Sequence, residues 1–312
     1  MTTAAMTEME KAMRRQPTEL TRLLEDPEPV APAAERVRGR RIFVVGTGTS
    51  FHAAHQGAYL LGFAGADATA VSAADSALWG PVPTPDDALV LLSHRGTKRY
   101  TSQVLARARE EGVATVTIGG IGSGAELETV EQERAGTFTA SHLAALLRLA
   151  QIAGALGGGL ELEAVPDAVA AALAAPSPGL DMPKRGLDFV GAGPNQWTAA
   201  EGALKVREAA HLFTSSYAVE QLLHGPGFAL ETGDGLVCLD GGGPGAPRLA
   251  ELAAAIEAGG ASVYRFSATD LGEALSIFPL TVVVQRIALD FAMLLGADPD
   301  NVRPSGWHGI EL

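Results

Sequence analysis

The sequence predicts an α/β protein with two similar domains in tandem, each a parallel sheet of about five strands with helices on both faces. Short apolar, β-branched runs alternate with helical patterns of 10–15 residues, which is typical of parallel sheets. A strand, glycine turn and helix occur in succession at residues 41–61 and again at residues 187–206. We therefore expect an N-terminal helical segment over residues 1–34 and two domains over residues 35–175 and 176–312.

The expected elements follow in order along the chain. The first 34 residues mix charged and apolar positions and then become rich in proline, which predicts one or two helices and a linker. The first domain is expected to contain strands at 41–45, 68–71, 88–92 and 114–118 and helices at 51–63, 100–111 and 139–156. After a second linker over residues 171–186, the second domain is expected to contain strands at 187–190, 235–239 and 261–266 and helices at 197–212, 247–258 and 281–295.

Composition narrows the class of protein. Of the 312 residues, 47% are hydrophobic and 19% are charged, so the chain can bury substantial cores. The formal net charge of −13 argues against a nucleic-acid partner or an anionic membrane surface. The N-terminus lacks the apolar core of a signal peptide, and the apolar helix expected near residues 143–156 is interrupted by Arg148 and Gln151. We expect a soluble, cytoplasmic protein.

No metal and no cofactor are expected. The one cysteine, Cys238, lies in an apolar run, so neither an internal disulfide nor a thiolate cluster can form, and a buried strand cysteine is the interpretation. His52 and His55 are spaced as a ligand pair on a helix, but no third ligand follows at a suitable spacing. Neither glycine turn matches the dinucleotide-binding fingerprint.

Three loops follow predicted strands, where open parallel sheets bind their ligands. The turn GTGTS at residues 46–50 offers backbone N–H groups, hydroxyls and a helix N-terminus, which suit a phosphate, although a plain strand–helix turn is the alternative. The segment at 93–101 (SHRGTKRYT) carries the densest basic patch of an acidic chain, which an anionic ligand would explain, with a solvated helix start as the equal alternative. The turn GAGPN at 191–195 is expected only to open the next helix.

Residues 200–226 carry a second set of candidates. Glu201, Lys205 and Glu208 are spaced to share one face of a helix, where an exposed ladder of ion pairs is the plain alternative to a functional role. His224 follows in the sequence LLHGP, where a lone histidine is more often structural. Together, however, a carboxylate, an ammonium group and an imidazole in one short segment are suited to moving protons.

The stretch AEGALKVREAAHLFTSSYAVEQLLHGP resembles the signature of the sugar isomerase (SIS) family. The likeness is to the second SIS domain in the isomerase half of glutamine–fructose-6-phosphate aminotransferases, which shows EGALKxKE and then a segment ending in HGP. GTGTS is similar to the family's first-domain GTS loop, and SHRGT falls where the family has its serine-rich SQSGET loop. The resemblance implies two tandem SIS domains without the glutaminase domain of those enzymes.

The resemblance also implies roles for particular residues. Glu208 would be the base that moves a proton between C1 and C2 of the open-chain sugar, with Glu201 and Lys205 orienting it. His224 would open the ring or shuttle protons, reaching the site from the other subunit of a homodimer whose active site is shared. The phosphate group and sugar would be held in the first domain by Thr47, Gly48, Thr49, Ser50, Ser93, His94, Arg95, Thr97 and Lys98.

Two departures from the family pattern affect the expected chemistry. The loop reads SHRGTK, so either the phosphate would be held by the charges of Arg95 and Lys98 more than by hydroxyls, or the ligand would differ. The family's C-terminal lysine, which forms an imine with the ketose, has Trp307 at or near its position, so imine catalysis by the tail is not expected. His308 would then act on the ring oxygen, or an aromatic side chain would close the pocket.

The sequence thus predicts an enzyme of carbohydrate metabolism that acts on a hexose or amino-sugar phosphate through an enediol or enolamine. The reactions left open are aldose–ketose isomerisation, ammonia-dependent amination and the deamination or deglycation of a fructosamine 6-phosphate. Without the tail lysine, a substrate that already bears nitrogen at the reacting carbon fits better, with isomerisation close behind. The alternative is a non-catalytic sugar-phosphate sensor, which would have no need of a proton-transfer carboxylate.

Overall fold

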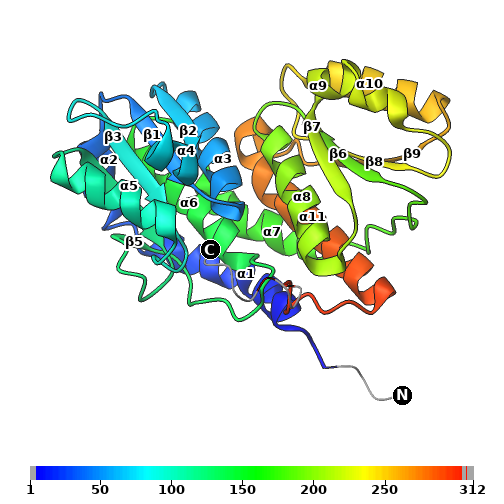
Figure 1. Ribbon diagram of the computed structural model, residues 1–312, viewed down its shortest axis with the longest axis horizontal. Helices are drawn as coiled ribbons and strands as arrows, with labels where there is room; N and C mark the ends of the chain where they lie inside the picture. Colours follow the sequence, from blue (N-terminus) through cyan, green and yellow to red (C-terminus); the bar gives the residue numbers. More distant parts are fainter. Residues whose placement is uncertain (1–4, 304–306, 308–312) are drawn as a thin grey trace. The chain divides into compact units, whose positions relative to one another are not determined.

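The computed structural model describes residues 5–303 and 307 of the chain, which folds into two compact units (Figure 1). The first-sheet unit comprises residues 15–133 and 138–166. The second-sheet unit comprises the described part of residues 1–14 together with residues 134–137 and 167–303. The boundary thus falls near residue 166, and the helix at the N-terminus contributes residues to both units.

The first-sheet unit is built on a wholly parallel sheet with strand order β2-β1-β3-β4-β5. The strands are β1 (Ile42–Gly46), β2 (Ala68–Ser72), β3 (Ala88–Leu92), β4 (Ala114–Gly119) and β5 (Leu127–Glu128). The helices are α2 (Val30–Val37), α3 (Thr49–Phe63), α4 (Ala73–Leu78), α5 (Arg99–Glu110) and α6 (Ala140–Ala155). Strands β1 and β3 are buried along their whole length, as their uninterrupted apolar sequences predict for central parallel strands.

The second-sheet unit has a four-stranded parallel sheet in its described residues, in the order β7-β6-β8-β9. About five strands were predicted, and the described residues contain four. The strands are β6 (Leu187–Gly191), β7 (Thr214–Ala218), β8 (Gly235–Asp240) and β9 (Ser262–Ser267). The helices are α8 (Asn195–Ala210), α9 (Val219–Leu223), α10 (Ala246–Ala258) and α11 (Gly272–Leu295), while α7 (Val165–Ala174) and α1 (Glu8–Glu25) contribute residues to both units.

The two sheets share the order second, first, third and fourth strand, and they share a turn geometry. A Cβ atom on Gly46, the last residue of β1, would lie 2.2 Å from the carbonyl oxygen of Ser50. A Cβ atom on Gly191, the last residue of β6, would likewise lie 2.2 Å from the carbonyl oxygen of Asn195. Each strand can therefore pass this closely under the helix that follows it only with glycine at its end, which explains why the glycine turn occurs twice in the sequence.

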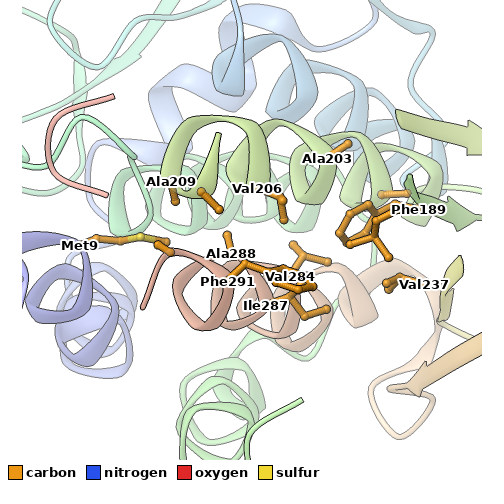
Figure 2. Packing of buried hydrophobic residues seen from close by; sticks show 14 of the residues in the cluster. Met9, Phe189, Ala203, Val206, Ala209, Val237, Val284, Ile287, Ala288 and Phe291 are labelled. Atoms are coloured by element: carbon orange, nitrogen blue, oxygen red, sulfur yellow. The ribbon is translucent and has the colours of Figure 1, made fainter. Parts of the chain in front are cut away.

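One core cluster of the second-sheet unit lies between the sheet, α8 and α11, and a second includes residues of the sheet, α9 and α10. Figure 2 shows Val206 of α8 with Ala288 and Phe291 of α11, and Met9 of α1 packs in the same cluster. By length and composition α11 could cross a membrane, but 67% of its most apolar stretch is buried inside the protein, which identifies it as a core helix. It begins nine residues earlier than predicted, because it continues through Pro279, whose one missing hydrogen bond is offset by the burial of its apolar neighbours.

Several other predictions need correction. Helix α2 occupies most of the expected N-terminal linker. Pro32 lies in its first turn, where backbone N–H groups have no partner within the helix, so the N–H group that proline lacks costs no hydrogen bond. Helix α7 takes up the first residues of the second expected linker. Strand β7 (TSSYA) was missed because it is a polar, half-buried edge strand without an apolar run. It lies between α8 and the segment that carries His224, which are therefore separate elements.

Candidate active site

The strand order of the first sheet locates a ligand-binding edge. Chain connections leave β1 and β3 in opposite directions along the sheet, so their carboxyl ends border a topological switch point, where open α/β sheets bind ligands. The turn at residues 46–50 follows β1, and the loop at residues 93–98 follows β3 (Figure 1). Both predicted phosphate-binding segments therefore lie at the carboxyl edge of the first sheet, on adjacent strands.

The turn after β1 leads directly into the N-terminus of a helix. Gly48 is the N-cap residue of α3, with φ of 59°, and as a glycine it offers no capping side chain. Thr47 is exposed, while Thr49 and Ser50 are partly buried in the first turn of α3. Hydroxyl groups beside a helix N-terminus can receive an anion, since the helix dipole favours negative charge there.

The loop after β3 borders a small pocket rich in hydroxyl groups. The pocket has a volume of about 50 Å³ and is lined in part by Ser93, Gly96, Thr101, Ser102, Thr117 and Ser123. The Ser93 hydroxyl accepts a hydrogen bond from the Gly96 N–H at 3.2 Å, which closes the loop on itself. Ser102 and Ser123 were not predicted. The glycine-rich run around Ser123, directly after a predicted strand, was the signal that could have indicated the second of them.

The basic side chains of the loop lie at the surface. The Arg95 guanidinium is exposed and stacks over the ring of Phe138 at 5.3 Å, and the Arg99 guanidinium lies 5.5 Å from the ring of Tyr100. Lys98 is the N-cap residue of α5, and Thr97 beside it is exposed. The positive charge therefore surrounds the start of α5, where an anionic ligand would offset its unfavourable interaction with the helix dipole.

His94 has a different setting from its neighbours. Its Nε2 accepts a hydrogen bond from the backbone N–H of Glu133 at 3.2 Å. Burial lowers the pKa of His94, as does the nearby Arg95 charge, while Glu133 acts in the opposite direction. The imidazole is therefore neutral at neutral pH, and it brings no positive charge to a phosphate.

Glu201, Lys205 and Glu208 form a continuous ion-pair cluster on α8. The Lys205 Nζ lies 2.6 Å from the Glu208 Oε2 and 3.4 Å from the Glu201 Oε1. Glu201 and Lys205 are 0% exposed, so the interpretation of an exposed ladder is wrong for these two residues. The Glu208 side chain is 26% exposed, which makes it the member of the cluster that a ligand can reach.

His224 lies on a different element from this cluster. His224 ends α9, its side chain is 77% exposed, and its Nε2 lies 3.3 Å from the Glu220 Oε2. Glu220 is also paired with Arg248 at 2.6 Å. His308 lies outside the described residues, and the neighbouring Trp307 is 54% exposed. The structure thus joins Glu201, Lys205 and Glu208 on one helix and presents His224 to the surface on another element.

No group of three or more His, Cys, Asp or Glu side chains in the described part of the chain is arranged to hold a metal ion. Cys238 lies buried in β8, and burial raises the pKa of its thiol to about 12. It therefore carries no reactive thiolate at neutral pH.

Comparison with known families supplies the next observation. Residues 37–122, which include β1, β3 and both loops, match the family model described as SIS domain. This part of the chain is therefore similar to SIS domains. The match covers most of the first sheet with its two loops, whereas a SIS domain around the second sheet stays a prediction.

Relatives extend the likeness beyond this domain. The glutamine–fructose-6-phosphate aminotransferase of Aeropyrum pernix is 26% identical over an aligned length of 329 residues, which covers 90% of this chain and 53% of that protein. The chain spans between 36% and 53% of the length of the first two such relatives. The chain is thus related to these aminotransferases, in agreement with the resemblance in its sequence.

Solved structures show the fold. Tagatose-6-phosphate ketose/aldose isomerase from Escherichia coli has a TM-score of 0.80 and 19% identity, with 96% of this chain and 97% of that chain covered. The C-terminal domain of glucosamine–fructose-6-phosphate aminotransferase from Francisella tularensis also has a TM-score of 0.80, with 16% identity and coverage of 96% and 99%. The described α/β fold, with both of its sheets, is thus similar to these structures.

Proposed function

We propose that this protein is an enzyme that moves a proton on a hexose or amino-sugar phosphate through an enediol or enolamine. The observation that carries the proposal is the buried Lys205 ammonium, which is paired with the Glu201 and Glu208 carboxylates. A buried ion cluster is expensive to form and does not by itself favour a stable fold. A partly exposed carboxylate at the end of such a cluster is, in contrast, well suited to act as a positioned base.

Each unit has its own part in the proposal. The first-sheet unit holds the phosphate group at the turn of residues 46–50 and the loop of residues 93–98, where Ser102 and Ser123 add hydroxyls to those predicted. In the second-sheet unit, Glu208 removes a proton from one carbon of the open-chain sugar and returns it to the neighbouring carbon. Lys205 and Glu201 fix the position of the Glu208 carboxylate, since the ammonium lies 2.6 Å from it.

The lysine content favours one reaction class. The chain has four lysines, of which Lys205 is buried in ion pairs and Lys11 pairs with Glu8 at 2.6 Å. An ion-paired ammonium is a poor nucleophile for imine formation. We therefore propose a substrate that already carries nitrogen at its reacting carbon, such as a fructosamine 6-phosphate that is deglycated or deaminated, with aldose–ketose isomerisation second. The names of the related aminotransferases and of the similar isomerase structure support this group of reactions.

We also propose that the enzyme is a homodimer in which His224 serves the partner's site, because its side chain is exposed and its Nε2 lies beside the Glu220 carboxylate. Mixing inactive Glu208→Gln and His224→Ala proteins under subunit exchange should then restore about a quarter of wild-type activity, since half of the dimers are mixed and each has one intact site. Steady-state assays of the mixture against each separate variant measure this. Activity that stays at the level of the separate variants would refute the shared site.

A thermal-shift panel tests the ligand class directly. Hexose, amino-sugar and fructosamine 6-phosphates should raise Tm, since a ligand at about 100 times its Kd stabilises the folded state by about 2.7 kcal/mol. The matched control is the same sugar without phosphate, and Lys98→Gln should reduce the shift. The phosphosugar function is wrong if no member of the panel changes Tm at millimolar concentration. A ligand that raises Tm but is neither converted nor exchanged with solvent hydrogen supports the sensor alternative.

A further inference from the structure

His94 holds one side of the loop at residues 93–98, in addition to the stacking of Arg95 on Phe138. The His94 carbonyl accepts hydrogen bonds from the Gly120 N–H and from the Gln132 Nε2, both at 2.9 Å. Its Nε2 accepts the Glu133 N–H at 3.2 Å. The imidazole also packs edge-on against the ring of Phe138, with the ring centroids 5.2 Å apart. Main chain and side chain of His94 are therefore both anchored to the segment that leads into α6.

Gly120 makes room for this arrangement. A Cβ atom at position 120 would lie 2.7 Å from the Cε1 of His94 and 2.6 Å from the Nε2 of Gln132. Atoms cannot approach so closely without displacing one another. The imidazole and the Gln132 amide thus occupy space that is open only because residue 120 is glycine.

Glu133, which donates the hydrogen bond to the His94 imidazole, is itself held in place. The Glu133 carboxylate is 4% exposed and accepts hydrogen bonds from the Thr139 N–H at 3.0 Å and the Ser141 N–H at 2.8 Å. It thereby satisfies N–H groups at the N-terminus of α6 that have no partner within the helix. Because Glu133 is held in this way, its own N–H group is a rigid donor for His94.

The contact requires a neutral ring. An Nε2 that accepts a hydrogen bond carries no proton, and a protonated imidazole would present an N–H group to the N–H of Glu133 instead. The other ring nitrogen, Nδ1, is buried and makes no hydrogen bond in the described part of the structure. Arg95 in the same loop disfavours a charge on His94, whereas the Glu133 carboxylate favours it, and burial is the larger influence on its pKa.

We propose that His94 is a positioning residue whose neutral imidazole fastens the 93–98 loop to the start of α6 and so keeps Ser93 and Gly96 in the shape that receives the phosphate group. The proposal rests on the proposed function. It assigns His94 to the shape of the site rather than to contact with the ligand. Protonation of His94 would break its hydrogen bond with the Glu133 N–H, so the affinity of the loop for an anion should fall at low pH.

Two variants separate the hydrogen-bond acceptor from the bulk of the side chain. His94→Leu fills space but cannot accept the Glu133 N–H, whereas His94→Gln offers an amide oxygen at similar reach. We expect the Kd for fructose 6-phosphate to rise about tenfold in His94→Leu and about twofold or less in His94→Gln, since a buried donor without a partner is costly. Gly120→Ala displaces the ring from outside the loop and should reproduce the effect of His94→Leu.

Amide hydrogen exchange at Glu133 measures the hydrogen bond from the Glu133 N–H to His94 in the absence of sugar. Protection should persist in wild type and His94→Gln and be lost in His94→Leu. If His94→Leu keeps both protection and affinity, or if the two His94 variants lose affinity equally, the positioning role is wrong. Wild-type protein that binds no phosphosugar but shows the expected exchange pattern would instead overturn the proposed function alone.

The pH dependence provides a readout that a general packing defect would not produce. With sulfate as the probe, which does not titrate in this range, wild-type affinity should fall more steeply than that of His94→Gln as the pH falls through the pKa of His94, which burial holds below the ordinary histidine value of about 6.5. The difference between the two profiles isolates His94 from Arg95, Glu133 and the remaining charges. Parallel profiles would contradict the proposal.

Discussion

Replacing Glu208 with glutamine should lower turnover of the sugar phosphate about 100- to 10,000-fold, the usual contribution of a positioned base. The amide keeps the size of the carboxylate and an oxygen for the Lys205 ammonium, which lies 2.6 Å from Glu208 in wild type. It cannot take a proton from carbon. Ligand affinity should therefore change little, because the phosphate group is held by other residues.

The assay for this variant need not presuppose the product. Exchange of the sugar hydrogen with deuterium from solvent, followed by NMR, reports proton transfer for any of the candidate reactions. Glu257→Gln is the matched control, because Glu257 is an exposed glutamate of the same unit, paired with Arg265 at 2.8 Å, and should keep wild-type rates. A Glu208→Gln protein that exchanges hydrogen within tenfold of wild type would exclude Glu208 as the base.

Replacing Lys205 with methionine should lower the free energy of unfolding by about 3–5 kcal/mol, the usual effect of breaking a buried ion pair. The Glu201 carboxylate is 0% exposed and would lose the ammonium that lies 3.4 Å from it. Chemical denaturation followed by intrinsic tryptophan fluorescence, to which Trp197 on the same helix contributes, measures the loss. Turnover should fall as well, since Glu208 loses the group that fixes it.

Lys11→Met provides a closely matched control. Lys11 pairs with Glu8 at 2.6 Å and i,i+3 spacing, like Lys205 with Glu208, but the Lys11 side chain is 49% exposed. Its loss should change stability by less than about 1 kcal/mol, because solvent screens exposed pairs. Adding Glu201→Gln to Lys205→Met should recover part of the lost stability. Equal effects at positions 11 and 205 would show that burial of the cluster has no energetic consequence.

The fold could be predicted in outline because its signals are local. Apolar strands such as β1 and β3, and the glycine turns after β1 and β6, can be recognised from a few consecutive residues. Strand β7 was missed because its residues owe their conformation to pairing with β6 rather than to their own pattern. The start of α11 was misplaced because Pro279 is tolerated only in the buried setting that tertiary packing supplies.

The sequence by itself determined which chemistry-bearing residues share an element: the common helix face of Glu201, Lys205 and Glu208, and the basic loop that follows a strand. These follow from spacing, which the helix repeat fixes. Only the tertiary structure decided that Lys205 is buried, that Glu208 is the accessible carboxylate and that His94 binds a backbone N–H instead of offering charge. Burial and hydrogen-bond partners depend on residues distant in sequence, so no local pattern could have revealed them.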